Sequence, residues 1–231
     1  MCETNRVQQI LTFKHCANDN RIFCFDIPDR CPLCEKEILK RDVDNTDEIE
    51  FDDDDDHSIK EIKSLPNPLK AANKSKCALA IRPTKGDFLS DYKNTSDLHI
   101  CLTMSDGKIV EFDDKGARVS EDGNEWQSCL IINMFDYLPA KINNHWDIKL
   151  REFIANKRWA KSEYHSVDNN CFDFVLEFLR SLNMKQFETS IESKTKFCET
   201  FIVPRTKLLA RYISLFRKIR SDGFVILGMN K

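Results

Sequence analysis

A single cysteine at the start of an apolar stretch has the setting of a catalytic nucleophile. Residues 164–182 run from a polar loop into a segment that would be apolar nearly all round a helix, which predicts a helix buried inside a domain. Asn169 or Asn170 would cap it, because a short amide side chain accepts hydrogen bonds from the unpaired N–H groups of the first turn. Cys171 would then take the first helical position, where the helix dipole favours a thiolate. Cys171 could also be an ordinary buried side chain, since most cysteines are small buried hydrophobes.

A thiolate needs a base, and the predicted hairpin at residues 96–113 supplies His99. Polar and apolar residues alternate along its first strand, so one face packs on a core and the other carries the histidine. A three-residue loop at 105–107, with glycine in the left-handed position, pairs Cys101 with Glu111. A two-residue loop would instead place the Glu111 carboxylate on the core face, so we expect the three-residue loop.

In this register Glu111 and Asp113 share the face of His99, one diagonal to it and the other opposite. A carboxylate beside the imidazole would fix its tautomer and stabilise its charged form, which in turn favours the thiolate. We expect Glu111 to orient His99, with Asp113 as the alternative. His145 and His165 are the rival bases, the first on a predicted helix at 144–154 and the second in the loop before the cysteine.

A second group of residues, near the N-terminus, has the spacing of a metal site. Cys31 and Cys34 form a Cys-Pro-x-Cys turn, in which two thiolates can reach one zinc ion at about 2.3 Å from each sulfur. Cys16 is the best third ligand, and His15 or Cys24 is the fourth. Neighbours on a strand point to opposite faces, so ligation by both 15 and 16 requires a turn there. We expect a structural zinc, and the alternative is a short hairpin with reduced thiols.

The elements around these residues divide the chain into three parts. Residues 1–40 form a zinc-knuckle hairpin module, with turn residues between two apolar runs at 10–25. Residues 41–75 form a disordered acidic linker, because a run of like charges cannot collapse and spaced prolines keep a chain extended. Residues 76–231 form the main domain, with a strand at 77–83, a helix capped by Thr206 and a final strand at 224–227.

Charge and composition narrow the class of protein. The net charge is −3, and residues 41–63 alone carry −8, so a surplus of only +5 is scattered over the rest and predicts no nucleic-acid partner. The ten cysteines, without a signal segment, point to a reducing compartment rather than a disulfide scaffold. No apolar run approaches the roughly 20 residues that span a bilayer. We expect a soluble intracellular protein, cytoplasmic or nuclear.

The order of histidine strand, hairpin and Asn-Cys helix start resembles the circularly permuted papain-like thiol hydrolases, which include PPPDE and lecithin-retinol acyltransferase-like enzymes. The matching pieces are residues 97–100, 106–112 and 169–175. The acyltransferase-like enzymes have a second catalytic histidine where this chain has Glu111, which disfavours acyl transfer onto a lipid. A resemblance over nearly the whole chain, carried by residues 31–34, 81–86, 96–99, 169–171 and 203–206, is to the makorin-2 opposite-strand protein family.

These observations predict an α+β fold, in which an antiparallel sheet packs on a central helix after the small zinc module. The predicted function is a cysteine hydrolase with the catalytic residues Cys171, His99 and Glu111, acting on an amide, isopeptide or thioester bond of a protein or acylated substrate. The alternative is an inactive papain-like scaffold that serves as a protein-binding or adaptor module.

Overall fold

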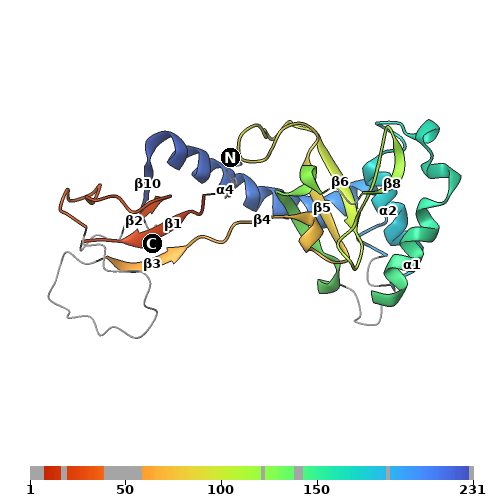
Figure 1. Cartoon of the computed structure of the whole chain (residues 1–231), viewed down its shortest axis with the longest axis horizontal. Coiled ribbons are helices and arrows are strands. Elements are labelled where there is room, and N and C mark those ends of the chain that lie inside the picture. The colour runs from red at the N-terminus through yellow and green to blue at the C-terminus, as the bar shows by residue number, and fades with distance from the viewer. Residues whose placement is uncertain are drawn as a thin grey trace, which may run out of the picture. The chain divides into compact units, whose positions relative to one another are not determined.

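Two antiparallel sheets and a few helices give the chain an α+β architecture (Figure 1). The computed structural model describes residues 8–16, 20–38, 59–120, 123–137, 143–185 and 188–228. The chain divides into two units, the first containing residues 1–67 and 214–231 and the second residues 68–213. The α+β class is therefore confirmed.

The first unit is built on a four-stranded sheet in the order β10-β2-β1-β3. Strands β1 (Leu11–Lys14) and β2 (Arg21–Cys24) pair antiparallel, which confirms the predicted N-terminal hairpin. Strand β3 (Lys60–Ser64) pairs with β1, and β10 (Phe224–Leu227) pairs with β2. The core of this unit includes Ile10, Phe13, Ile22, Cys24, Cys31 and Ile38.

Two sequence predictions about this part of the chain are wrong. Residues 59–75 were expected to continue the disordered linker, yet they hold β3 and β4 (Leu69–Lys70). Backbone pairing at the edge of a sheet needs few apolar side chains, so the charge pattern concealed these strands. The final strand was assigned to the domain at 76–231, but it completes the sheet of the first unit. The linker prediction for 41–58 lies outside the described residues.

The second unit is built on a six-stranded antiparallel sheet in the order β4-β9-β5-β6-β7-β8. Its strands after β4 are β5 (Ala78–Pro83), β6 (Leu98–Thr103), β7 (Ile109–Asp113), β8 (Gly116–Ser120) and β9 (Cys129–Asn133). Its main helices are α1 (Asn143–Ile154) and α2 (Cys171–Ser181), followed by the short α3 (Lys194–Phe197), a π-helix (Cys198–Ile202) and the first part of α4 (Val203–Asp222). Single 3-10 turns occupy Ala72–Lys74, Asn124–Trp126, Met134–Asp136, Lys157–Trp159 and Lys161–Glu163.

Helix α2 is buried between the sheet and α1, as its apolar pattern predicts. It packs against β6 and β7, and the ring of Phe174 lies 5.8 Å from that of Phe112. On its other side the Phe178 ring lies 4.9 Å from Trp146 of α1. Because both sides of α2 are packed with aromatic rings, its first turn has a fixed position relative to β6 and β7.

The hairpin of β6 and β7 has the predicted three-residue loop and register. The backbone N–H of Met104 donates to the carbonyl of Lys108 at 2.8 Å, and Gly107 has φ +86°. Leu102 pairs with Val110, as the three-residue loop requires. The loop is also tied to α1, since the backbone N–H of Ser105 donates to Asp147 at 2.9 Å.

Helix α4 begins at Val203, three residues before the predicted cap at Thr206. The Thr206 hydroxyl donates back to the carbonyl of Ile202 at 3.2 Å, as a threonine inside a helix does. Pro204 lies just after the π-helix and has no N–H to donate back to that turn.

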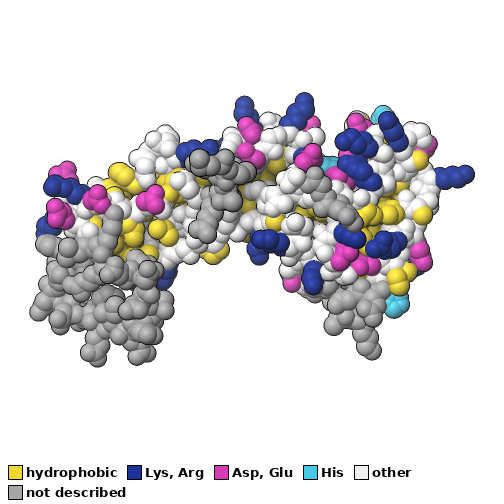
Figure 2. All heavy atoms as spheres, in the orientation of Figure 1, with side chains coloured by type: hydrophobic (Ala, Val, Ile, Leu, Met, Phe, Trp, Pro, Cys, Tyr) yellow, Lys and Arg dark blue, Asp and Glu magenta, His cyan; other side chains and the backbone are white. Residues whose placement is uncertain are grey.

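Charged side chains of both signs lie interspersed over the face of the molecule seen in Figure 2. Among the helices of the described residues, none is both long and apolar enough to cross a membrane.

Candidate functional site

The first turn of α2 is held by a complete capping box around Asn170. Its side-chain oxygen accepts hydrogen bonds from the backbone N–H groups of Phe172 at 2.9 Å and Asp173 at 3.4 Å. The Asp173 carboxylate accepts in return from the backbone N–H of Asn170 at 3.0 Å. Asn170 is therefore the cap, and the Asn169 amide instead donates to the carbonyl of Glu163 at 2.8 Å. Cys171 is the first helical residue, and the cap does not use its N–H.

His99 lies between Cys171 and Glu111 in a buried environment. Its Nε2 is 3.2 Å from Oε2 of Glu111, and the two side chains are 9% and 6% exposed. Burial lowers the pKa of His99, but side-chain hydrogen bonds with Cys171 and Glu111 outweigh it and raise the pKa to about 9. The structure thus brings the three predicted catalytic residues together.

Glu111, rather than Asp113, contacts the imidazole. Both oxygens of Asp113 accept hydrogen bonds from the guanidinium of Arg118, and the distance from Nη2 to Oδ2 is 2.8 Å. Arg118 also donates from Nη2 to Oε1 of Glu111 at 2.7 Å. Burial raises the pKa of Glu111, but the hydrogen bond with His99 and the charge of Arg118 lower it, and the net direction is downward. Glu111 is therefore an ionised partner for the imidazole.

On the face of the sheet that carries His99, an aromatic ring covers the imidazole. The Trp126 ring centroid is 5.5 Å from that of His99, and the guanidinium of Arg82 lies 5.0 Å from the Trp126 ring. Arg82 is in turn paired with Glu125 at 2.6 Å. The face of β6 that carries the histidine is thus a second packed layer, which explains why His99 is buried.

Neither rival histidine takes part in this arrangement. The side chain of His165 is 61% exposed, and its Nδ1 lies 3.2 Å from a carboxylate oxygen of Asp168. His145 is exposed on α1. Among the histidines of the described residues, His99 is the one that interacts with Cys171.

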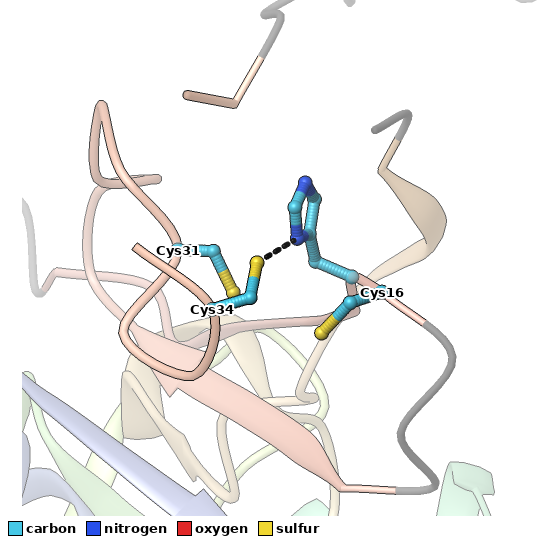
Figure 3. A group of neighbouring side chains, drawn as sticks. Cys16, Cys31 and Cys34 are labelled. Atoms are coloured by element: carbon cyan, nitrogen blue, oxygen red, sulfur yellow. Dashed lines mark hydrogen bonds between the residues drawn. The ribbon is translucent and has the colours of Figure 1, made fainter. Parts of the chain in front are cut away.

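Four side chains of the first unit form a cluster that could hold a metal ion. The ligand atoms of His15, Cys16, Cys31 and Cys34 all lie within 4.8 Å of one another. The Cys34 sulfur is 3.5 Å from Nδ1 of His15, and Figure 3 shows the three labelled cysteines around this contact. Donors bound tetrahedrally at zinc distances are separated by about 3.5–3.8 Å. The donor types suit zinc, and the 3.5 Å separation of Cys34 and His15 matches that of two ligands of one ion.

A turn at Cys16 lets neighbouring residues share the cluster. Cys16 has φ +57°, a left-handed conformation that brings its side chain and that of His15 to the same place. Cys24, the alternative ligand, is buried and is not one of the four clustered side chains. Burial and the nearby carboxylate of Asp26 raise the pKa of Cys24 to about 11, which disfavours the thiolate that a metal needs.

Two family models match the chain, DUF4796 C-terminal over residues 63–219 and DUF4796 N-terminal over residues 8–38. The chain belongs to the DUF4796 family. A human relative, the MKRN2 opposite strand protein, is 28% identical over 217 residues, which cover 94% of this chain and 88% of the relative. The predicted resemblance to makorin-2 opposite-strand proteins is therefore confirmed. No solved structure matches the chain.

Both clusters of this DUF4796 protein lie inside the matched segments. The four potential metal ligands lie in the N-terminal match and the catalytic candidates in the C-terminal match. Neither family description names an activity. Arg118 is the residue of the site that the sequence prediction missed. Its place opposite Glu111 in the β7–β8 ladder becomes visible only when β8 is recognised as a third strand after the hairpin.

Proposed function

We propose that this DUF4796 protein is a cysteine hydrolase of the permuted papain-like type, which cleaves an amide, isopeptide or thioester bond. One observation carries the proposal: His99 interacts with Cys171 at the start of α2 while its Nε2 is bound by Glu111. Nucleophile, base and orienting carboxylate in this order are the parts of a catalytic triad.

Each side chain has a defined step in the proposed reaction. With Nε2 donating to Glu111, Nδ1 of His99 is the nitrogen that takes the proton of the Cys171 thiol. The thiolate attacks the carbonyl carbon, and the N–H of Cys171 donates to the oxyanion. The imidazolium returns its proton to the departing amine or thiol as the bond to it breaks. Water then attacks the thioester, gives a proton to His99, and releases the acid and the thiol.

We propose further that the cluster in the first unit binds a structural zinc through His15, Cys16, Cys31 and Cys34. Bound there, the ion would supply cross-linking rather than catalysis, because four protein ligands complete its tetrahedral shell. It would fix His15, which directly follows β1, to the turn that carries Cys31 and Cys34.

The hydrolase proposal is tested by the pH dependence of alkylation with iodoacetamide, followed for each cysteine by mass spectrometry on the zinc-loaded protein. We expect Cys171 to react near neutral pH at least about tenfold faster than Cys198, because an ion pair with His99 favours the thiolate whereas burial raises the pKa of Cys198. His99→Ala should remove the advantage, and His165→Ala should leave it unchanged. A Cys171 that reacts no faster than Cys198 would contradict the proposal.

Burial of the pair favours a second candidate, an inactive scaffold that binds a partner protein. Cys171 is only 5% exposed and His99 only 7%, so a substrate must displace covering side chains to reach the sulfur. The same alkylation experiment distinguishes the two functions. In a hydrolase one thiol is alkylated faster than the others and this advantage requires His99, whereas an inactive scaffold has no such thiol.

A further inference from the structure

Arg118 of β8 binds two carboxylates beside His99. It donates to Oε1 of Glu111 at 2.7 Å and to Oδ2 of Asp113 at 2.8 Å, while its second terminal nitrogen donates to the other oxygen of Asp113. The β7–β8 ladder explains the contacts, because Arg118 lies directly opposite Glu111 and diagonal to Asp113. One guanidinium therefore joins both carboxylates of the face that carries His99.

This arrangement divides the two oxygens of Glu111 between two partners. Oε1 accepts from Arg118, and Oε2 lies 3.2 Å from Nε2 of His99. Glu111 is 5% exposed, so water contributes little to the orientation of its carboxylate. The guanidinium therefore holds Glu111 in the rotamer that reaches the imidazole.

The charges of the cluster show what Arg118 does to the imidazole. Glu111 and Asp113 carry two negative charges, and Arg118 reduces their sum to one. A nearby anion raises the proton affinity of an imidazole and a nearby cation lowers it. One net negative charge stabilises the imidazolium of the ion pair, whereas two would hold its proton more tightly and slow its transfer to a leaving group.

We propose that Arg118 is a positioning residue of the site, whose net effect on His99 is to limit the basicity of the imidazole by neutralising one of two carboxylates. This inference rests on the proposed hydrolase function, because only a proton-transferring His99 needs its basicity limited.

Other groups around His99 belong to neighbouring elements and are left in place by a change at position 118. Arg82 of β5 pairs with His99 across the ladder but is itself neutralised by Glu125. Cys171 reaches the imidazole from α2 and interacts with it directly. A Cys171→Ala background therefore isolates the effect of the carboxylates and of Arg118.

The experiment measures the pKa of His99 by NMR titration of the zinc-loaded, full-length protein in the Cys171→Ala background. The His99 signal is assigned from its loss in His99→Gln. We expect Arg118→Met to raise the pKa of His99 by about one unit, because a partly exposed cation close to the imidazole is removed. Arg118→Gln removes the same charge with a polar side chain, so it provides the test if the methionine variant does not fold.

Two variants serve as controls. Arg118→Lys keeps the charge and should leave the pKa close to that of the parent. Arg158→Met removes an exposed arginine that stacks on Trp159 and should cause no shift. An unchanged or lowered pKa of His99 in both charge-removing variants would overturn the inference.

The two experiments distinguish a failure of this inference from a failure of the proposed function. Alkylation of Cys171 in the parent protein decides whether the site has an activated thiol. An unreactive Cys171 would contradict the hydrolase proposal. An activated Cys171, together with an unchanged pKa of His99 in the Arg118 variants, would contradict only the role proposed for Arg118.

Discussion

At the scale of single residues, the site depends on a buried ion pair whose strength varies with pH. The folded-state pKa of His99, about 9, lies above its ordinary value of 6.5, so its stabilising contribution is complete below pH 6.5 and is lost as pH rises through about 9. The pKa of Glu111 is lowered from 4.5, so its contribution is present above that pH and is lost as pH falls through the lowered value. The two contributions coexist between these limits.

Glu111→Gln should therefore destabilise the protein most between about pH 5 and 6.5, by about 2 kcal/mol, because a charge-assisted hydrogen bond to His99 is lost. The free energy of unfolding in urea, measured from pH 5 to 10, should show the difference shrinking as the pH passes 9. Glu152→Gln, at an exposed residue 3.6 Å from Lys149, should change the free energy of unfolding by about 0.5 kcal/mol or less. A cost that is the same at every pH would contradict the ion pair.

Gly107 is required by the hairpin loop for two separate reasons. Its φ is +86°, and a Cβ atom there would lie 2.2 Å from the backbone oxygen of Asn73. Gly107→Ala should cost about 3 kcal/mol, since both the strained backbone and the clash destabilise the fold. Gly223→Ala is the matched control, because φ is +82° but no atom lies within 4 Å, and it should cost about 1 kcal/mol. Equal losses in urea unfolding would show that the clash is relieved by movement.

At the scale of elements, the start of α2 positions the proposed nucleophile. Asn170→Ala should reduce the free energy of unfolding by about 1 kcal/mol, because two N–H groups of the first turn lose their acceptor. Asn170→Ser keeps a capping oxygen and should retain most of the stability. The alanine variant should also slow alkylation of Cys171 more than the serine variant does. Equal alkylation rates in the two variants would show that the cap does not position the cysteine.

The elements that the sequence predicted well are those whose pattern and turn chemistry agree. The β6–β7 register followed from one glycine and one carboxylate that could not face the core, and the α2 start followed from an asparagine before an apolar run. The strand at Lys60–Ser64 was missed because its partner edge, rather than its own side chains, stabilises it. Arg118 was missed for a related reason, since its role depends on which strand lies beside Glu111.

At the scale of the whole molecule, the two ends of the described chain meet in one sheet. Strand β10, near the C-terminus, pairs with β2 of the N-terminal hairpin, and Val225 is only 4% exposed. The sequence could not reveal this pairing, because an isolated apolar strand carries no information about its partner. His15 and Cys16 follow a strand of this sheet, and the proposed zinc would link them to Cys31 and Cys34.

Removing the proposed zinc should therefore loosen the C-terminal strand as well as the N-terminal hairpin. In hydrogen exchange, chelation should increase the rates by about tenfold or more at the β10 N–H groups that donate to β2, because β10 pairs with a hairpin that loses its cross-link. Rates at Leu79 and Ile81 of the six-stranded sheet should change much less, since that sheet belongs to the other unit. Cys31→Ser should reproduce the effect with a loss of bound zinc, whereas Cys24→Ser should keep the metal. Protection of β10 that survives the loss of zinc would show that apolar packing alone holds the two ends together.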